Sequence, residues 1–227
     1  MRRLVSTLSI FLTVAACGSE PGANAGLKDV LVTSLKARKE AKEAKDQPKP
    51  PPVALTRDAI AHIDKPLLRI SAQTLGVKTL FAEVAQSGAY RTYLNNLKMS
   101  VTYRSGIITA TRGFGLDLLS QGISITPEEM FVQSDTPKFY TRTQQQLVNI
   151  KTVAKLSYNC ILEKGDVETI TIVEIDYELV KYSETCRNEN RAFSNFYWVA
   201  DDTRKIWKSA QSIGEQAGFF ITEVLVP

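Results

Sequence analysis

Residues 148–182 read VNIKTVAKLSYNCILEKGDVETITIVEIDYELVKY, and this stretch decides the fold. β-Branched and aromatic residues dominate it, as they do in β-strands. The polar run at residues 163–166, which includes a glycine, predicts a turn between two extended arms, residues 148–162 and 167–182. The stretch therefore predicts a long β-hairpin.

The second arm of this hairpin has a regular alternation. From Val173 to Leu179, apolar side chains alternate with acidic ones, which is typical of a sheet with one face in water. Ile170 and Ile172 are in the opposite phase. Because a shift of one residue moves side chains to the other face of a strand, this change predicts a bulge or twist at residues 172–173.

The same composition extends on both sides of the hairpin. Short runs of branched or aromatic residues are separated by glycine, asparagine and serine, and Ser105-Gly106 is a tight hairpin signal. Residues 56–227 are therefore predicted to form one mainly β domain, a large antiparallel β-barrel or sandwich with meander connections. Further strands are predicted at residues 67–71, 79–85, 90–94, 100–104, 107–111, 193–199, 205–213 and 219–224.

Two short helices interrupt this β pattern. Thr56 is a suitable N-cap for a helix that carries Ala59 and Ile60 and ends before a proline. Between the two halves of the domain, residues 120–146 form a central polar insert, with a second short helix predicted at residues 127–131.

The first 16 residues have the features of a secretory signal peptide. Arg2 and Arg3 precede a short apolar run, and Val-Ala-Ala leads directly to Cys17. This arrangement is typical of a bacterial lipobox, in which the cysteine receives a diacylglycerol and an acyl chain such as palmitate. The alternative is an ordinary secreted protein with a chance cysteine near its cleavage site.

Residues 17–55 are predicted to be a flexible tether between the lipidated Cys17 and the β domain. The segment is rich in lysine, alanine and proline and has no core-forming pattern. In lipoproteins of this kind an aspartate after the cysteine favours the inner membrane, whereas this chain has Gly18. We therefore expect a lipid-anchored protein of the outer membrane that faces the periplasm.

The remaining two cysteines are Cys160 and Cys186. An even pair in an oxidising compartment predicts a disulfide. Two buried free thiols are the alternative, and a structural zinc site is disfavoured because such a site needs four ligands.

No catalytic constellation is evident in the sequence. The formal net charge of +4 is too small to predict a nucleic-acid partner. His62 is the only histidine, and no cofactor or metal motif is present. Asp117 and Glu223 are possible members of the carboxylate pair that a glycosidase requires, but nothing in the sequence places them opposite each other. The chain is therefore predicted not to be an enzyme.

Four residues are candidates for a ligand or partner surface. Arg112 and Asp117 flank a Gly-Phe-Gly segment where they can pair across a turn, although the sequence favours a purely structural strand exit here. Tyr197 and Trp207 offer aromatic faces that suit sugars, although aromatic residues in a strand meander also fill cores.

Several ordered motifs resemble one family. Residues 107–119 (IITATRGFGLDLL) are similar to its "ATRGLG-DL" segment, and residues 193–199 (FSNFYWV) to its "F-N-YWV" strand. Residues 208–220 resemble its "SRQW…GY" ending. The chain thus resembles, over about residues 55–227, the YjbF/GfcB lipoproteins of group 4 capsule and exopolysaccharide operons.

The resemblance implies a large antiparallel barrel or sandwich, with Cys160 and Cys186 at the position of the family's own cysteine pair. It also implies a role in the secretion or assembly of polysaccharide at the cell envelope. Polysaccharide, or the proteins that export it, are then the expected partners. A polysaccharide-modifying hydrolase and a purely structural envelope lipoprotein remain the alternatives. Ser212, Ala210 and Tyr93 depart from the family motifs.

Overall fold

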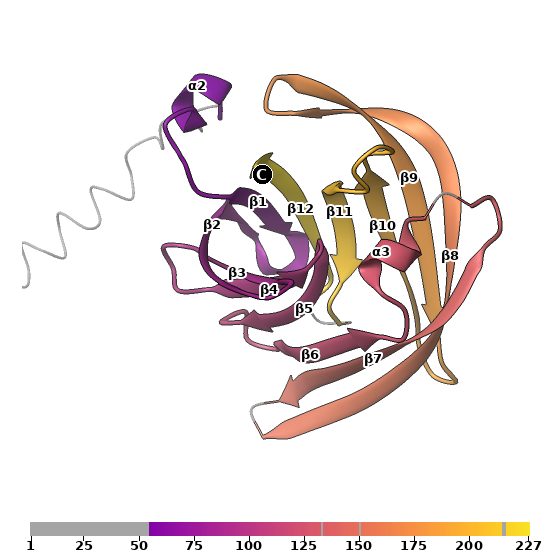
Figure 1. Ribbon diagram of the computed structural model, residues 1–227. Helices are drawn as coiled ribbons and strands as arrows, with labels where there is room; N and C mark the ends of the chain where they lie inside the picture. The colour runs from indigo at the N-terminus through magenta and orange to yellow at the C-terminus, as the bar shows by residue number, and fades with distance from the viewer. Residues whose placement is uncertain (1–54, 133, 150, 215–216) are drawn as a thin grey trace, which may run out of the picture. The chain divides into compact units, whose positions relative to one another are not determined.

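The computed structural model describes residues 55–132, 134–149, 151–214 and 217–227. The predicted signal peptide, Cys17 and nearly all of the predicted tether lie outside these residues. Within them, the strands form a single antiparallel sheet that curls into a nearly closed barrel (Figure 1). The prediction of a mainly β barrel is confirmed.

The twelve strands follow one another around the barrel as a meander. Each strand pairs with the next in the chain except β5 and β6, and β1 pairs with β12. The strands are β1 (Leu67–Ala72), β2 (Val77–Ser87), β3 (Tyr90–Leu94), β4 (Ser100–Arg104), β5 (Ile107–Arg112), β6 (Leu118–Ile123), β7 (Lys138–Asn149), β8 (Thr152–Ile172), β9 (Ile175–Arg187), β10 (Ala192–Val199), β11 (Ile206–Ser212) and β12 (Phe219–Val226).

The helices of the described residues are short. They are α2 (Arg57–Ile60), α3 (Pro127–Met130) and a 3-10 turn at Gln73–Leu75. None of them has the length and apolar character needed to cross a bilayer. The N-cap prediction for α2 is confirmed, because the Thr56 hydroxyl accepts a hydrogen bond from the amide of Ala59 at 3.3 Å.

Side chains bridge β5 and β6, the two edges of the sheet. Arg112 donates from Nη1 to the carbonyl of Leu118 at 3.1 Å and from Nη2 to that of Leu119 at 3.2 Å. On the same seam Gln121 Nε2 donates to the carbonyl of Ile108 at 2.5 Å. These bonds occupy edge carbonyls that would otherwise offer a template for another strand.

Two clusters of buried apolar side chains form the core of the barrel. The first gathers residues of β1 to β5 and β12, including Ile70, Phe81, Val101, Ile108 and Phe220. The second gathers residues from α3 and β7 to β11, including Met130, Leu162, Tyr182, Tyr197 and Val199. The strand alternation therefore directs one face of the sheet inward along most of its length.

The predicted turn at residues 163–166 is wrong. These residues lie within β8, at a register shift in its pairing with β9. The hairpin instead turns at Val173 and Glu174, which both have positive φ angles, 43° and 66°. This is the condition for a tight type I′ turn. The change of phase at residues 172–173 thus marks the turn itself and not a bulge or twist within one strand.

The other boundaries of the hairpin region also differ from the prediction. β7 ends at Asn149 and β8 begins at Thr152, so the predicted arm 148–162 covers parts of two strands. The polar segment 120–146 contains the predicted short helix as α3, but also the end of β6 and most of β7. It is therefore part of the barrel wall and not an insert between its halves.

Residues 168–179 of β8 and β9 form a ribbon that pairs only with itself. The tip of this ribbon packs against α2 and against β1 and β12. Ile172 and Val173 join Ile60, Leu67 and Leu225 in a third buried cluster. The ribbon therefore folds back onto the barrel wall.

Arg57 fastens this tip. Its guanidinium donates to the carbonyls of Ile172, Val173 and Leu225, each at 2.7 Å. Its own amide donates to the carboxylate of Glu174 at 3.0 Å. Val173 is a β-branched residue at positive φ, which is a strained conformation. These four hydrogen bonds of Arg57 hold the tip in this conformation, and we call them the Arg57 clamp.

Candidate functional site

One end of the barrel holds a large cavity. Because successive strands run in opposite directions, the β2–β3, β4–β5 and β10–β11 turns lie at the same end, together with α3. They enclose a cavity of about 650 Å³, which we call the mouth cavity. Its size is within the usual range of small-ligand sites. Its rim includes Gly88, Ala89, Ser105, Gly106, Glu128 and Thr203.

The wall of the mouth cavity combines aromatic rings and hydroxyl groups. Tyr93 and Tyr103 meet edge to face with ring centroids 5.7 Å apart. Tyr103 shares a hydrogen bond of 2.7 Å with the hydroxyl of Thr222, and Ser209 accepts one from Gln211 at 2.9 Å. Burial raises the pKa of Tyr103, so its phenol is neutral at physiological pH.

The charged side chains that line the cavity are predominantly basic. Arg91, Arg204, Lys205 and Lys208 line it, against the single acidic side chain of Glu128. Glu128 accepts a hydrogen bond from Ser105 at 2.9 Å.

Lys205 lies over an aromatic ring at the cavity. Its Nζ lies 4.2 Å from the centre of the Trp207 ring, and Trp207 stacks on Tyr177 with centroids 4.3 Å apart. Burial and the charge of Arg91 lower the pKa of Lys205. Arg91 itself forms an ion pair with Glu83 at 2.9 Å.

A second polar group lies in the barrel interior, around Glu184. Arg142 donates to both oxygens of this carboxylate, with the shortest contact at 2.6 Å, and both side chains are almost fully buried. Tyr140, Tyr197 and Asn195 also donate to it, at 2.7, 2.8 and 2.6 Å. Burial alone would raise the pKa of Glu184, but the charge of Arg142 and these donors hold it below its ordinary value.

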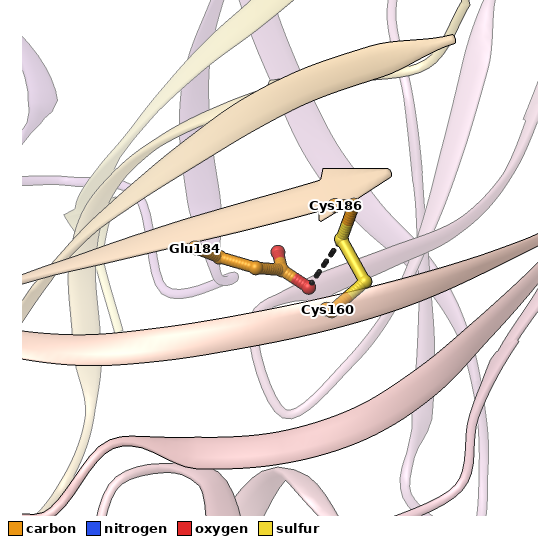
Figure 2. Close-up of side chains that lie close together, drawn as sticks. All are labelled: Cys160, Glu184 and Cys186. Carbon is orange, nitrogen blue, oxygen red and sulfur yellow. Dashed lines mark hydrogen bonds between the residues drawn. A yellow bond between two sulfur atoms is a disulfide. The ribbon is translucent and has the colours of Figure 1, made fainter. Parts of the chain in front are cut away.

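The predicted disulfide between Cys160 and Cys186 lies beside this group (Figure 2). The two cysteines are directly opposite each other on β8 and β9, with Cα atoms 4.0 Å apart. The sulfur of Cys186 lies 3.3 Å from Glu184 Oε1. A disulfide sulfur has no proton to donate, so we describe this approach as a contact and not as a hydrogen bond.

Within the described residues, the sole cluster with the spacing of a metal site is formed by these two cysteines and Glu184. It does not suit a metal, because a metal needs thiolates and both sulfurs are in the disulfide. The carboxylate is already neutralised by Arg142.

Asp117 holds the loop between β5 and β6. Its carboxylate accepts hydrogen bonds from the Thr111 hydroxyl at 2.9 Å and from the amides of Gly113 and Phe114 at 2.9 and 3.2 Å. Arg112 is exposed and donates to backbone carbonyls. No ion pair between Arg112 and Asp117 is present among the described residues. These contacts favour the structural explanation of both residues, a fixed strand exit.

Asp117→Ala is expected to lower the free energy of unfolding by about 1–3 kcal/mol, because buried amide donors lose their acceptor. Urea unfolding followed by circular dichroism measures this change. Asp117→Asn retains one carbonyl acceptor and is expected to have a smaller effect. Equal stabilities of Asp117→Ala and the parent chain would contradict this role.

The structure separates the remaining candidates. Tyr197 is fully buried in the second core, so its assignment to a ligand surface is wrong. Trp207 lines the mouth cavity, but Tyr177 and Lys205 lie over its ring. Glu223, on β12, forms an ion pair with Arg69 at 2.6 Å. Four strands lie between β12 and β5, the strand that precedes Asp117, so the sheet order does not bring the two carboxylates of the possible glycosidase pair onto neighbouring strands.

Comparison with known proteins explains the motifs seen in the sequence. The model of a family described as group 4 capsule polysaccharide lipoprotein GfcB, YjbF, matches residues 26–225. The chain belongs to the GfcB/YjbF family. The match begins well before the predicted start at about residue 55, so it includes much of the predicted tether.

A solved structure has the same fold as this GfcB/YjbF protein. It is the hypothetical lipoprotein YmcC from Escherichia coli K12, which is 12% identical in sequence and superposes with a TM-score of 0.63. The comparison covers 84% of this chain and 94% of that one. No curated protein matches the chain.

The mouth cavity of this GfcB/YjbF protein was not predicted from the sequence. Its residues come from turns that are far apart in the chain, such as Arg91 and Lys205. The one local signal is the segment 203–208, where a tryptophan lies among three basic residues, a threonine and an isoleucine. Mixed basic and aromatic residues in a loop indicate a binding surface only when a cavity is known to lie beside them.

Proposed function

We propose that this chain is an outer-membrane lipoprotein, anchored through lipid on Cys17, whose β domain faces the periplasm. There it supports the secretion or assembly of capsule or exopolysaccharide and catalyses no reaction. It acts by contact with the glycan, and the mouth cavity supplies the contact region.

The family match over residues 26–225 carries this proposal, because that family is described as capsule polysaccharide lipoproteins. The mouth cavity supports it further. A wall of tyrosine rings and hydroxyl groups presents both the apolar faces and the hydrogen-bonding groups that sugars use.

Deletion of the gene is expected to reduce surface polysaccharide several-fold, and the parent gene restores it. Cys17→Ala is expected to lose membrane attachment and to restore little, because the acyl chains that hold the protein at the membrane are absent. Quantification of extracted glycan and membrane fractionation measure the two effects.

Gly18→Asp provides the matched control, since it leaves the lipid in place and is expected to shift the protein to the inner membrane. A deletion strain with unchanged polysaccharide would refute the role in export. Outer-membrane attachment of Cys17→Ala would refute the lipid anchor.

A further inference from the structure

Two cationic side chains from different turns line the mouth cavity. Arg91 comes from the start of β3 and Lys205 from the β10–β11 loop, and both line the same space. They are close enough that the charge of Arg91 lowers the pKa of Lys205.

Within the part of the chain that the structure describes, no acidic side chain forms an ion pair with Lys205. Among the ion pairs of the described residues, Arg91 has Glu83 as its partner, whereas none contains Lys205. The ammonium is partly removed from water and lies over the Trp207 ring, which holds it in place. A half-buried cation beside another cation is destabilised unless an anion lies between them.

We propose that the mouth cavity binds an acidic sugar residue of a glycan, with the anionic group between Lys205 and Arg91. This inference rests on the proposed function and names the charge class of its ligand. Lys205 supplies charge from the loop, and Arg91 supplies a planar fork of donors that suits a carboxylate or phosphate.

The rest of the cavity wall fits a sugar better than a free inorganic anion. Tyr103 and Thr222 share one hydrogen bond, so one of their two O–H groups remains available as a donor. Ser209 accepts from Gln211 and keeps its own O–H. These groups lie beside the ring of Tyr93 and the apolar side chain of Leu68, so the cavity has contacts for hydroxyl groups as well as for charge.

The test uses the full lipidated chain in detergent, titrated calorimetrically with hexagalacturonate, and with maltohexaose as the neutral oligomer of equal length. Hexagalacturonate is expected to bind at least tenfold more tightly than maltohexaose. Its affinity is expected to fall as salt is raised, because salt screens exposed charges. Lys205→Gln is expected to weaken binding about tenfold, through the loss of a charge-assisted contact, and Lys205→Arg to retain it.

Lys155→Gln is the matched control. Lys155 is an exposed lysine of β8 that does not line the cavity, so its substitution is expected to leave the affinity unchanged. Thermal unfolding of each variant checks that the fold is intact.

Equal affinity for the two oligomers, no binding of either, or an equal loss in Lys155→Gln and Lys205→Gln would each overturn the inference. Tighter binding to glycerophosphoglycerol, the water-soluble headgroup of phosphatidylglycerol, than to hexagalacturonate would also overturn it, in favour of a lipid ligand. These results are distinct from failure of the proposed function, which appears as unchanged polysaccharide in the deletion strain.

Discussion

Glu184→Ala is expected to lower the free energy of unfolding by about 3–5 kcal/mol, because it leaves the guanidinium of Arg142 buried without a counter-charge. The side chain of Arg142 is only 1% exposed, so water cannot replace the lost carboxylate. Tyr140, Tyr197 and Asn195 also lose their acceptor. Urea unfolding of the parent chain and the variant measures the difference.

Glu178→Ala is the matched control for this substitution. Glu178 lies on the same strand, is exposed, and accepts one hydrogen bond from Thr169. Its loss is expected to change stability by no more than about 0.5 kcal/mol. The double variant Arg142→Leu/Glu184→Leu is expected to be more stable than Glu184→Ala, since no lone charge remains. A double variant as unstable as Glu184→Ala would contradict this explanation.

The same carboxylate predicts how stability depends on pH. The pKa of Glu184 in the folded protein lies below its ordinary value of 4.5, which is the value expected in the unfolded chain. The stabilisation is therefore fully present above that pH, and it is lost as the pH falls through the folded pKa. Between pH 7 and 3 the parent chain is expected to lose more stability than Glu184→Ala. Parallel pH profiles would argue against a charged Glu184.

Loss of the disulfide is expected to have an effect of similar size. The two cysteines are separated by 26 positions, and the chain-entropy relation gives about 3.5 kcal/mol for a loop of this length. Cys160→Ala/Cys186→Ala is therefore expected to unfold at a clearly lower urea concentration than the oxidised parent. If the two midpoints coincide, the disulfide does not contribute to stability.

The disulfide and the buried ion pair are also expected to be coupled. The sulfur of Cys186 lies 3.3 Å from Glu184 Oε1, so removing either the disulfide or the carboxylate changes the surroundings of the other. Neighbouring sites of this kind show interaction energies of about 0.5–3 kcal/mol in double-mutant cycles. Combining Glu184→Ala with Cys160→Ala/Cys186→Ala tests this, and strictly additive effects would show that the two groups act independently.

Much of the fold follows from local sequence patterns. Strands such as β3 and β4 were predicted with the bounds that the structure has, because short alternating runs and a Ser-Gly turn mark them. The hairpin turn was misplaced because Gly165 is the strongest local turn signal. In the structure this glycine lies within β8, where it allows close approach to the neighbouring strand. A Cβ at this position would lie 3.0 Å from the carbonyl oxygen of Lys181. The true turn uses Val173 and Glu174, which are unfavourable turn residues held by distant contacts.

The buried charges were missed for a related reason. On β7 the inward positions are Tyr140, Arg142, Gln144 and Gln146, whereas Phe139 is 71% exposed. An alternation of polar and apolar residues normally places the polar ones in water. In β7 several polar residues point inward instead, so the hydropathy pattern does not identify the inward face of this strand. The disulfide could be predicted, because two cysteines in a chain with the features of an exported protein have few other uses.

The Arg57 clamp determines where the domain first bears a pulling force that is applied to its N-terminal side. A pulling force on the chain ahead of Leu55 first reaches α2, and the three carbonyl bonds of Arg57 then share the load. Two of these bonds lead to the ribbon tip and one to β12, the partner strand of β1. The load is therefore distributed over two distant parts of the barrel before β1 can peel away. A domain built in this way is expected to resist traction that is applied to its N-terminal end.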